Sequence, residues 1–286
     1  MSYLSGHFGD DIRADCHVAL SPASRTQVEV QSSVQSMYGK AIVEQVTQIL
    51  DNAGVKASVH IQDAGALPFT IAARMECAIW QAFPDLPRAT VSFPTFNPRS
   101  LRRTRLYIPG NTPKYFAHAG LFNADALIFD LEDSVPEAEK QEALCLIRHF
   151  LSSETLSGTE VMVRVNKGET QAAELAALAG FDGLTVLIPK VESSESIPQG
   201  FPQFRFIALL ESALGMLNAP HIASSHEVEA LAIGLEDYTA DLGAQRSVDG
   251  IEAWWAYGQV VNSARAYGKQ PLASSYTLVD DMEGLK

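Results

Sequence analysis

Residues 206–237 read FIALLESALGMLNAPHIASSHEVEALAIGLED and contain the pattern that decides the fold. Two short apolar runs, 206–210 and 230–234, have the length of buried strands and are separated by a helical stretch. An acidic residue follows each run, Glu211 directly and Asp237 shortly after the second run. Because consecutive parallel strands end at the same edge of a sheet, this stretch predicts a β/α repeat with both carboxylates on one rim.

The same alternation extends through residues 100–286. Short apolar runs recur at 105–108, 126–131, 161–165, 184–188, 206–210, 230–234 and 271–275. Helical stretches separate them, for example at 113–121, 137–152, 170–179 and 251–267. This alternation predicts a parallel sheet of the (β/α)₈ barrel kind, with its chemistry at the carboxyl ends of the strands. An open doubly wound sheet is the alternative, but its dinucleotide-binding form is disfavoured because no GxGxxG follows the first strand.

A complete barrel of this kind has eight strands and typically needs about 250 residues. The chain from residue 100 onward is shorter and supplies seven candidate strands. Residues 281–286 are typical of the start of a seventh helix. We therefore expect an α/β fold, a TIM (β/α)₈-type barrel that lacks its last strand and its C-terminal segment.

The first 84 residues have a different pattern. Strand-like alternation is found at 16–20, 27–32 and 55–63, and helical stripes at 36–53 and 71–83, with Pro68 interrupting before the second helix. This pattern predicts a small α+β domain, with an antiparallel sheet backed by helices. The segment 85–99 is rich in proline, which removes backbone donors and favours extended geometry, so it is expected to be a linker. The predicted division is 1–84, 85–99 and 100–286.

Composition excludes several classes of protein. The chain has 286 residues, a formal net charge of −13, and 47% hydrophobic residues, which is typical of a globular protein. Nucleic-acid binders usually present a basic face, so the acidic balance argues against that class. No apolar run is long enough to span a bilayer, and no secretory signal is visible. Three widely spaced cysteines favour a reducing, cytoplasmic setting without disulfides or a zinc site.

Acidic residues at the ends of the predicted strands are the first candidates for chemistry. Glu211 and Asp237 form the kind of carboxylate pair that Mg²⁺ takes from a protein while keeping several waters. Each acid considered singly has the alternative interpretation of a helix cap. Asp130 and Glu132, in FDLEDS, share a face if the strand continues, and either could bind a metal water or orient an arginine. The alternative there is N-capping of the next helix, which suits Asp133 better than Asp130.

Basic residues form the second group of candidates. Arg164 lies inside an apolar strand, so its guanidinium must meet either an anionic ligand or a structural carboxylate such as Asp130 or Glu132. Lys190, at the end of its strand, allows the same two interpretations, a ligand contact or a salt bridge. Gly110 could let a ligand approach the backbone closely, or could form a plain turn.

A basic cluster leads into the first strand of the barrel. It consists of Arg99, Arg102, Arg103 and Arg105. Guanidinium groups near a barrel mouth could hold a phosphate, such as that of a nucleotide-tailed thioester. A solvated linker end is the interpretation we favour for Arg99 and Arg102.

Residues 100–286 resemble the citrate lyase β-subunit family of the HpcH/HpaI aldolase superfamily. The matching segments are LRRTRLYIPGNTP, ADALIFDLEDSVPEAEK, VMVRVNK, GLTVLIPKVES, ALLESALGMLNAPHIA and ALAIGLEDYTADLG, in this order. The resemblance implies a Mg²⁺-dependent TIM barrel that cleaves carbon–carbon bonds in 3-hydroxy acyl thioesters. It implies metal ligands at Glu211 and Asp237, and substrate acid or thioester contacts at Arg103 and Arg164. Asp130 and Glu132 match the acidic site motif.

Residues 10–82 resemble the citrate lyase acyl carrier (γ) subunit. The segments QSSVQSMYGKAI and IQDAGALPFTIAARMECAI carry this match. That family attaches a phosphoribosyl-dephospho-CoA arm to a serine just before its first strand, and Arg13 stands at the equivalent position here. Ser5 and Ser21 are nearby but out of register. The sequence therefore argues against an attached arm and favours a relic, a docking module or a cover over the barrel, with free CoA thioesters as substrates.

These expectations combine into one predicted function. It is a Mg²⁺-dependent carbon–carbon lyase that cleaves a citryl-, citramalyl- or malyl-CoA type thioester to an acetyl thioester and a keto acid. Arg164, Asp130 and Glu132 would be catalytic, and Arg103, Gly110 and Lys190 would bind the substrate. The resemblance also implies a homo-oligomer, a trimer or hexamer, or a citrate lyase-like complex.

Two alternative functions remain open. The family continues into a C-terminal segment that supplies a catalytic acid, and we expect this chain to lack it. The first alternative is therefore a non-catalytic or partner-completed subunit of a citrate lyase-like complex. The second is an aldolase that acts on free keto acids.

Overall fold

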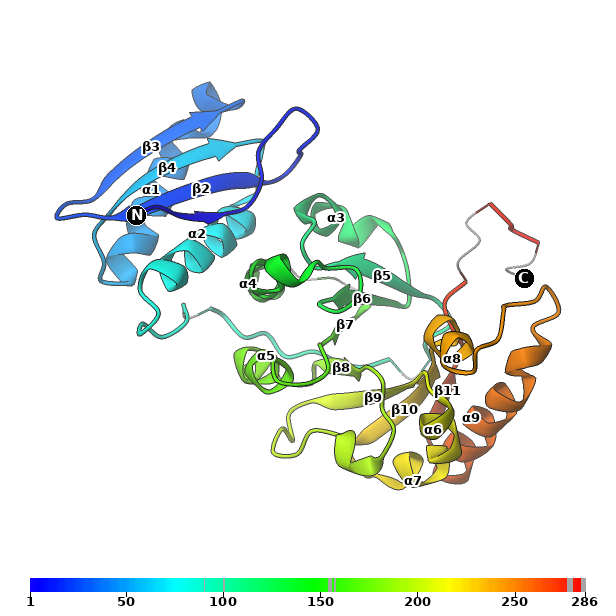
Figure 1. The fold of residues 1–286 in the computed structure, drawn as a ribbon. Helices are drawn as coiled ribbons and strands as arrows, with labels where there is room; N and C mark the ends of the chain where they lie inside the picture. Colours follow the sequence, from blue (N-terminus) through cyan, green and yellow to red (C-terminus); the bar gives the residue numbers. More distant parts are fainter. Residues whose placement is uncertain (90, 100, 154–155, 157, 277–279, 284–286) are drawn as a thin grey trace. The chain divides into compact units, whose positions relative to one another are not determined.

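The computed structural model describes residues 1–89, 91–99, 101–153, 156, 158–276 and 280–283. The N-terminal region forms a four-stranded sheet with two helices (Figure 1). Its strands, in the spatial order β1-β2-β4-β3, are β1 (Tyr3–Ser5), β2 (Cys16–Pro22), β4 (Ala57–Asp63) and β3 (Gln27–Ser32). Helix α1 (Gln35–Asn52) connects β3 to β4, and α2 (Pro68–Ala82) follows β4. The predicted small α+β fold is therefore present.

The prediction of an antiparallel sheet is wrong for one pair of strands. β1 pairs antiparallel with β2, and β2 with β4, but β3 and β4 are parallel, with Val28 opposite Val59. The reason is the connection between β3 and β4, since an 18-residue helix carries the chain back to the end of the sheet at which β3 began. β1 lies in a segment with no clear alternation and was not predicted.

The core of this region is formed by alternating strand residues and one stripe of each helix. Val46 and Leu50 of α1 pack with Val59 and Ile61 of β4, and Met75 of α2 completes the same cluster. Pro68 starts α2 as its first residue instead of interrupting it, because the first turn of a helix needs no donor from that residue.

A second sheet has seven strands. In sequence order they are β5 (Arg105–Pro109), β6 (Ala126–Asp130), β7 (Glu160–Arg164), β8 (Thr185–Ile188), β9 (Arg205–Leu210), β10 (Val228–Ile233) and β11 (Gln270–Leu272). The spatial order is β11-β10-β9-β8-β7-β6-β5, and consecutive pairs from β7 to β11 are parallel. Each predicted run thus becomes a strand of an α/β TIM-like sheet, although β11 is shorter than predicted.

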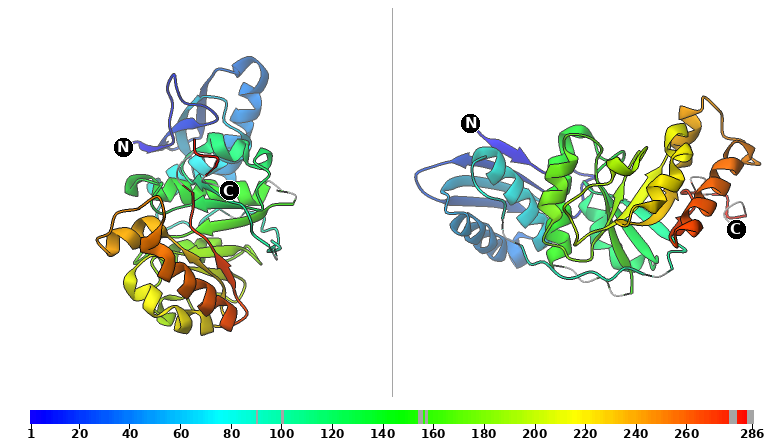
Figure 2. Two further views of the ribbon diagram at one scale, coloured as in Figure 1. Left: turned by 90° about the vertical axis from the view of Figure 1, so that its right-hand side faces the viewer. Right: turned by 90° about the horizontal axis from the view of Figure 1, so that it is seen from below.

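Helices connect these strands. They are α3 (Pro113–Ala117), α4 (Lys140–Ser153), α5 (Gln171–Leu178), α6 (Ala213–Leu217), α7 (Ala219–Ser224), α8 (Leu235–Asp241) and α9 (Trp254–Ala266). Short 3₁₀ turns are η1 (Ala119–Leu121), η2 (Glu137–Glu139), η3 (Ser194–Ser196) and η4 (Ile251–Ala253). Helices α7 and α9 pack on β10, and α9 also packs on β11 (Figures 1 and 2).

Three of these helices were not predicted individually, because α6, α7 and α8 are each only five to seven residues long. The expected helix at residues 281–286 is a turn at 281–283, and residues 284–286 lie outside the described residues. Residue 100, the predicted start of the barrel, also lies outside them. Among the described residues, no helix is both long and apolar enough to cross a membrane.

The chain forms two compact units, Met1–Pro94 with Leu106–Thr159, and Thr95–Arg105 with Glu160–Lys286. Inside the first unit α2 packs on α4, with the rings of Phe69 and Phe150 at 5.3 Å in an edge-to-face arrangement. The division into 1–84, 85–99 and 100–286 stays a prediction.

The contact between α2 and α4 is predicted to depend on pH through Glu76. Burial alone would raise the pKa of this carboxyl, but the hydrogen bond to His149 and the charge of Arg148 outweigh burial and lower it. A lowered pKa in the folded state stabilises the protein above the unfolded value of about 4.3. That stabilisation is lost as the pH falls below this value towards the folded pKa. Urea unfolding of the full chain between neutral and acidic pH should show this loss. Glu76→Gln should reduce the loss of unfolding free energy at acidic pH. Glu44→Gln, on an exposed part of α1, should leave that loss unchanged.

Candidate functional site

Glu211 lies at the carboxyl end of β9 and is buried, with 5% of the residue exposed. Its Oε1 atom accepts a hydrogen bond from the backbone N–H of Lys190 at 2.8 Å. Lys190 comes two residues after β8 ends and has a left-handed backbone conformation, with φ +51°. The turn after β8 therefore holds the carboxylate at the end of β9.

Asp237 lies in the first turn of α8, the helix that follows β10. Its Oδ2 atom is 3.3 Å from the ammonium nitrogen of Lys190. Lys190 thus contacts both acids, one through its backbone and the other through its side chain. Since Ile233 at the end of β10 is in register with Leu210 of β9, the two acids follow neighbouring parallel strands at the same edge. The structure shows the salt bridge of Lys190 to Asp237, and its role as a substrate contact stays a prediction.

The helix-cap interpretation of the two acids is not what the structure shows. The residue that caps α6 is Ser212, whose Oγ accepts from the backbone N–H of Gly215 at 3.1 Å. Helix α8 begins after Gly234, so Asp237 lies inside its first turn and does not occupy the N-cap position. Both carboxylates are therefore positioned without serving as helix caps.

Gly234 provides the space that Glu211 occupies. A Cβ atom at this position would lie 2.4 Å from Oε2 of Glu211 and 3.1 Å from its Cβ. Gly234 has a φ of −107°, so other residues could adopt its backbone conformation. The requirement for glycine here comes from the close approach of the carboxylate and not from the turn.

Gly234→Ala is therefore expected to displace the Glu211 carboxylate while leaving the fold intact. A contact of 2.4 Å is far below van der Waals distance, so the side chain must move. We expect Mg²⁺ affinity to fall by roughly 10–100-fold, as for other changes that misorient a metal ligand. Titration of the full chain with Mg²⁺ by calorimetry measures this effect. Gly258→Ala, in helix α9 where a Cβ meets open space and the backbone is helical, provides a glycine control away from the two acids. Equal Mg²⁺ affinity in Gly234→Ala and wild type would contradict the expectation.

Asp130 and Glu132 lie at the end of β6, in the first compact unit. Asp130 is fully buried, and its carboxylate accepts from the backbone N–H groups of Glu132, at 3.0 Å, and Ser134, at 3.1 Å. Neither Asp130 nor Asp133 is the N-cap of the helical turn that follows, since that position is Pro136, which makes no side-chain cap bond. The carboxylate of Asp130 closes the loop after β6, because it lies at the strand end where those N–H groups converge. Asp130 thereby orients Glu132, which is also buried.

Gly110 begins the turn after β5 and lies against β6. Its N–H donates to the carbonyl of Asp130 at 2.9 Å, and a Cβ would lie only 2.4 Å from that oxygen. The close approach predicted for this glycine is therefore to the neighbouring backbone. Its role as a substrate contact stays a prediction.

The arginines of the basic cluster lie in different environments. Arg102 is buried, with 3% exposed, so the interpretation as a solvated linker end is wrong for this residue. Its guanidinium donates to Glu160 at 2.7 and 2.8 Å, to Glu229 at 2.6 Å and to Gln270 at 2.8 Å. These partners are at the amino ends of β7, β10 and β11. The buried carboxylate of Glu160 and the partly exposed one of Glu229 hold the guanidinium at this end, opposite the carboxyl ends of the strands that Glu211 and Asp237 follow.

The other predicted arginines remain candidates. Arg103 is exposed and comes two residues before β5 begins. Arg164 is the last residue of β7, is 8% exposed, and is in register with Leu187 of β8. Their roles in binding substrate stay predictions.

Several polar residues near the carboxyl edge were not singled out from the sequence. Ser212 donates to Glu192 at 2.9 Å, and Lys167 donates to the carbonyl of Lys190 at 3.1 Å. The segments PKVES and RVNK contain two of these residues, and their position after strands was the available signal.

Next to Asp237, burial and then the charge of Asp241 raise the pKa of Tyr238, which therefore stays a neutral phenol.

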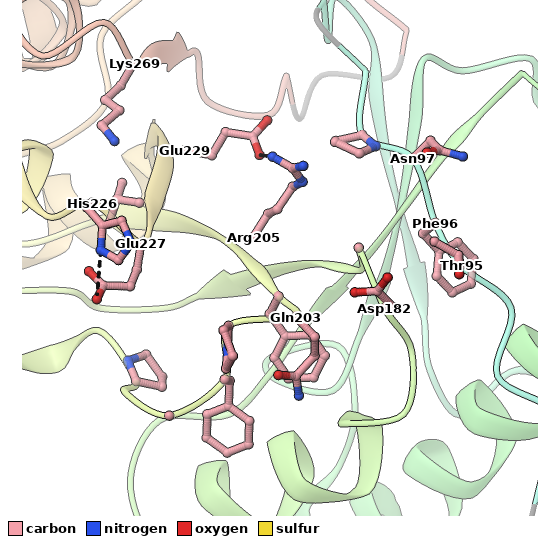
Figure 3. Close-up of a pocket in the computed structure, with 18 of the residues that line it drawn as sticks. Thr95, Phe96, Asn97, Asp182, Gln203, Arg205, His226, Glu227, Glu229 and Lys269 are labelled. Atoms are coloured by element: carbon pink, nitrogen blue, oxygen red, sulfur yellow. Dashed lines mark hydrogen bonds and ion pairs between the residues drawn. The ribbon is translucent and has the colours of Figure 1, made fainter.

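A cavity of about 860 Å³ lies at the other end of the strands. Figure 3 shows its lining residues, among them Arg205, Glu229 and Lys269. Arg205 begins β9, and Lys269 immediately precedes β11. No predicted site residue lines this cavity, so its size alone does not make it the candidate active site.

Comparison with known families decides where this chain belongs. Residues 103–286 match the family model described as HpcH/HpaI aldolase/citrate lyase, which covers more than half of the chain. The chain belongs to the HpcH/HpaI aldolase/citrate lyase family. Residues 7–82 match a second model, that of the malonate decarboxylase delta subunit, so this family member carries a domain of the acyl-carrier type. Both predicted resemblances are confirmed at this level.

Members of the family with curated names are similar over the same region. Citrate lyase subunit beta of Leuconostoc mesenteroides subsp. cremoris is 34% identical over 207 residues, which cover 66% of this chain and 68% of that protein. A (3S)-malyl-CoA thioesterase of Cereibacter sphaeroides is 33% identical over 189 residues, covering 64% of this chain and 66% of that protein. The chain thus spans about two thirds of the length of these relatives.

Solved structures of the family match as well. The citrate lyase beta subunit of Mycobacterium tuberculosis with oxaloacetate and magnesium is 33% identical, with a TM-score of 0.58, over 66% of this chain and 85% of that one. The M. tuberculosis protein CitE in complex with magnesium, acetoacetate and coenzyme A matches with 33% identity and a TM-score of 0.57, over 65% of this chain and 71% of that one. These matches support the α/β TIM-like fold.

Proposed function

We propose that this protein is a Mg²⁺-dependent carbon–carbon lyase that cleaves a 3-hydroxy acyl-CoA thioester to an acetyl thioester and a keto acid. The observation that carries the proposal is the pair of carboxylates, Glu211 directly after β9 and Asp237 in the first turn of the helix that follows the neighbouring parallel strand β10. Family relatives named for citrate lyase and malyl-CoA, and solved structures with magnesium, oxaloacetate or coenzyme A, support the type of reaction and substrate.

The residues present fit a magnesium ion. Mg²⁺ is bound through one or two carboxylates and keeps several waters, which matches two acids better than a closed protein cage. Among the described residues, no group of three or more His, Cys, Asp or Glu side chains gathers as a metal site. Gly234 leaves the space that Oε2 of Glu211 occupies, which supports a role for this carboxylate at the strand end. We therefore propose Glu211 and Asp237 as the magnesium ligands.

When bound, Mg²⁺ polarises substrate oxygens and stabilises negative charge, so that the 3-hydroxyl loses its proton more easily. The chain's own residues do the rest. The N–H of Lys190 fixes the orientation of Glu211, and its ammonium keeps Asp237 in place. We propose that Arg164, and also Arg103, offset the charge that develops as the carbon–carbon bond breaks to a keto acid and a thioester enolate.

The remaining predicted site residues have supporting roles in this proposal. Asp130 holds the loop that presents Glu132, and Glu132 supplies the acidic group of the family's site motif. Gly110 and Lys190 contribute contacts to the substrate acid or thioester.

Turnover assays on the full chain with citryl-, citramalyl- and malyl-CoA, with Mg²⁺ and with chelator, test the proposal. We expect Mg²⁺-dependent release of a keto acid from one of the three thioesters. Absence of turnover of all three would contradict the lyase function and favour a non-catalytic subunit. Intact mass, measured in parallel, tests the expected absence of a prosthetic arm, because an added mass of that size would restore a carrier role.

We also propose that the protein is cytoplasmic and homo-oligomeric, as a trimer or hexamer, or is part of a citrate lyase-like complex. Its three cysteines are free thiols, which suits a reducing compartment. Exposed apolar side chains on helices of the second unit, such as Trp254, Trp255 and Leu217, suit an interface. Sedimentation velocity on the purified chain distinguishes these states from a monomer.

A further inference from the structure

A separate cavity of about 520 Å³ lies inside the first compact unit, among α1, α2, α4 and residues 86–89. Apolar side chains form most of its walls, including Ile49 from α1, Ala53 directly after α1, Ile79 from α2, and Leu86. Its volume is that of a pocket for a small organic molecule. None of the residues proposed for the lyase site belongs to it.

The polar groups of this cavity are concentrated on the side formed by α2, α4 and Arg88. Glu76 is buried, with 4% exposed, and both of its carboxylate oxygens are already engaged. Oε1 accepts from Arg148, and Oε2 is 2.6 Å from Nε2 of His149. Because these two partners are close, Glu76 has little remaining capacity to neutralise a further cation.

Arg88 is that further cation. Its guanidinium is 3.7 Å from Oε1 of Glu76, which is longer than a hydrogen bond, and its side chain is 21% exposed. It stacks over the ring of Trp80 at 4.5 Å and lies 3.8 Å from the sulfur of Cys145. The amide oxygen of Gln141 accepts from it at 2.7 and 3.0 Å when that amide is turned to satisfy both groups. The close partners of Arg88 are thus mostly neutral. Its nearest carboxylate among the described contacts is that of Glu76, which already contacts Arg148 and His149.

We propose that this cavity binds a small organic monocarboxylate, with the carboxylate at Arg88 and an apolar body among Ile49, Ala53, Ile79 and Leu86. A guanidinium whose close partners are neutral favours one additional anion, and bidentate recognition of carboxylate is its usual mode. The apolar walls disfavour a compact, fully hydrated anion such as inorganic phosphate. The site is independent of the proposed lyase activity, because it uses none of the same residues.

The test compares two probes of equal shape, hexanoate and its neutral analogue hexanamide, titrated into the full chain by calorimetry. We expect hexanoate to bind at least about tenfold more tightly, since a charge-assisted hydrogen bond is worth that factor or more. Arg88→Gln should reduce hexanoate affinity to that of hexanamide, and Arg88→Lys should restore part of the preference. Arg25→Gln, at an exposed arginine between β2 and β3, should change nothing.

A second experiment fills the cavity with a larger side chain from its own wall. Ala53→Phe should abolish binding of both probes, and Ala72→Leu serves the same purpose if the first variant does not fold. Absence of saturable binding of hexanoate to the wild-type chain would overturn the proposal. An unchanged preference for hexanoate in folded Arg88→Gln, or unchanged binding in folded Ala53→Phe or Ala72→Leu, would also overturn it.

Discussion

Replacing Glu211 with glutamine is expected to lower the kcat of Mg²⁺-dependent thioester cleavage by about 10³-fold, an effect comparable to removal of a strong electrostatic group from an active site. The amide is similar in size to the carboxylate, so the space beside Gly234 and the bond from Lys190 are kept. Only the charge that would bind the metal is lost. Steady-state kinetics with the thioester turned over by the wild type, at several Mg²⁺ concentrations, measures the effect.

A matched control is available one residue before the second proposed ligand. Glu236 lies in the same first turn of α8 but is exposed and pairs with Arg246. Glu236→Gln should leave both kcat and the dependence on Mg²⁺ within about twofold of wild type, as expected for an exposed charge outside the site. Activity retained in Glu211→Gln, with no requirement for Mg²⁺, would be incompatible with the proposed metal site.

Replacing Glu160 with alanine is expected to lower the free energy of unfolding by about 3–5 kcal/mol, the usual cost of breaking a buried ion pair from one side. Glu160 is 3% exposed and receives two bonds from Arg102, one from the hydroxyl of Thr185 at 2.7 Å and one from the backbone of Arg99 at 3.1 Å. Without it, the Arg102 guanidinium stays buried with one partly exposed carboxylate, Glu229.

Chemical denaturation of the full chain, followed by circular dichroism, measures this loss. Glu236→Ala removes an exposed ion pair with Arg246 and should cost less than about 1 kcal/mol. Similar stabilities of the two variants would show that the network around Arg102 contributes little. Because Glu160 lies at the amino end of β7, a change in kcat beyond the loss of folded protein is not expected.

Local pattern was enough to predict much of this protein. The strands β6 to β10 correspond to short apolar runs because they are mostly buried, and a buried parallel strand must be apolar on both faces. The runs that predicted β5 and β11 gave strands that are only partly buried. Glu211 and Asp237 could be selected because acids that follow two consecutive runs closely must lie at the same edge if the strands are parallel. The family resemblance rests on the same segments, since the polar strand ends are where the family motifs lie.

Other features depended on residues far apart in the chain. The sequence pattern predicted that Arg102 is a solvated residue of the basic cluster. Its burial follows from the approach of Glu160, Glu229 and Gln270 in the folded chain. The parallel pairing of β3 with β4, the loop closure by Asp130, and the space that Gly234 leaves for Glu211 have the same origin.

The sequence by itself therefore determined the order and type of the main strands and helices and the edge of the sheet on which the candidate acids lie. Periodicity along the chain reports which residues are buried, and the alternation of strands with helices indicates parallel pairing. The tertiary structure alone decided which charges pair and which glycine is required. Ion pairing and steric exclusion act between atoms within a few ångströms of one another, whereas the residues that carry them, such as Arg102 and Glu229, are separated by more than a hundred positions in the chain.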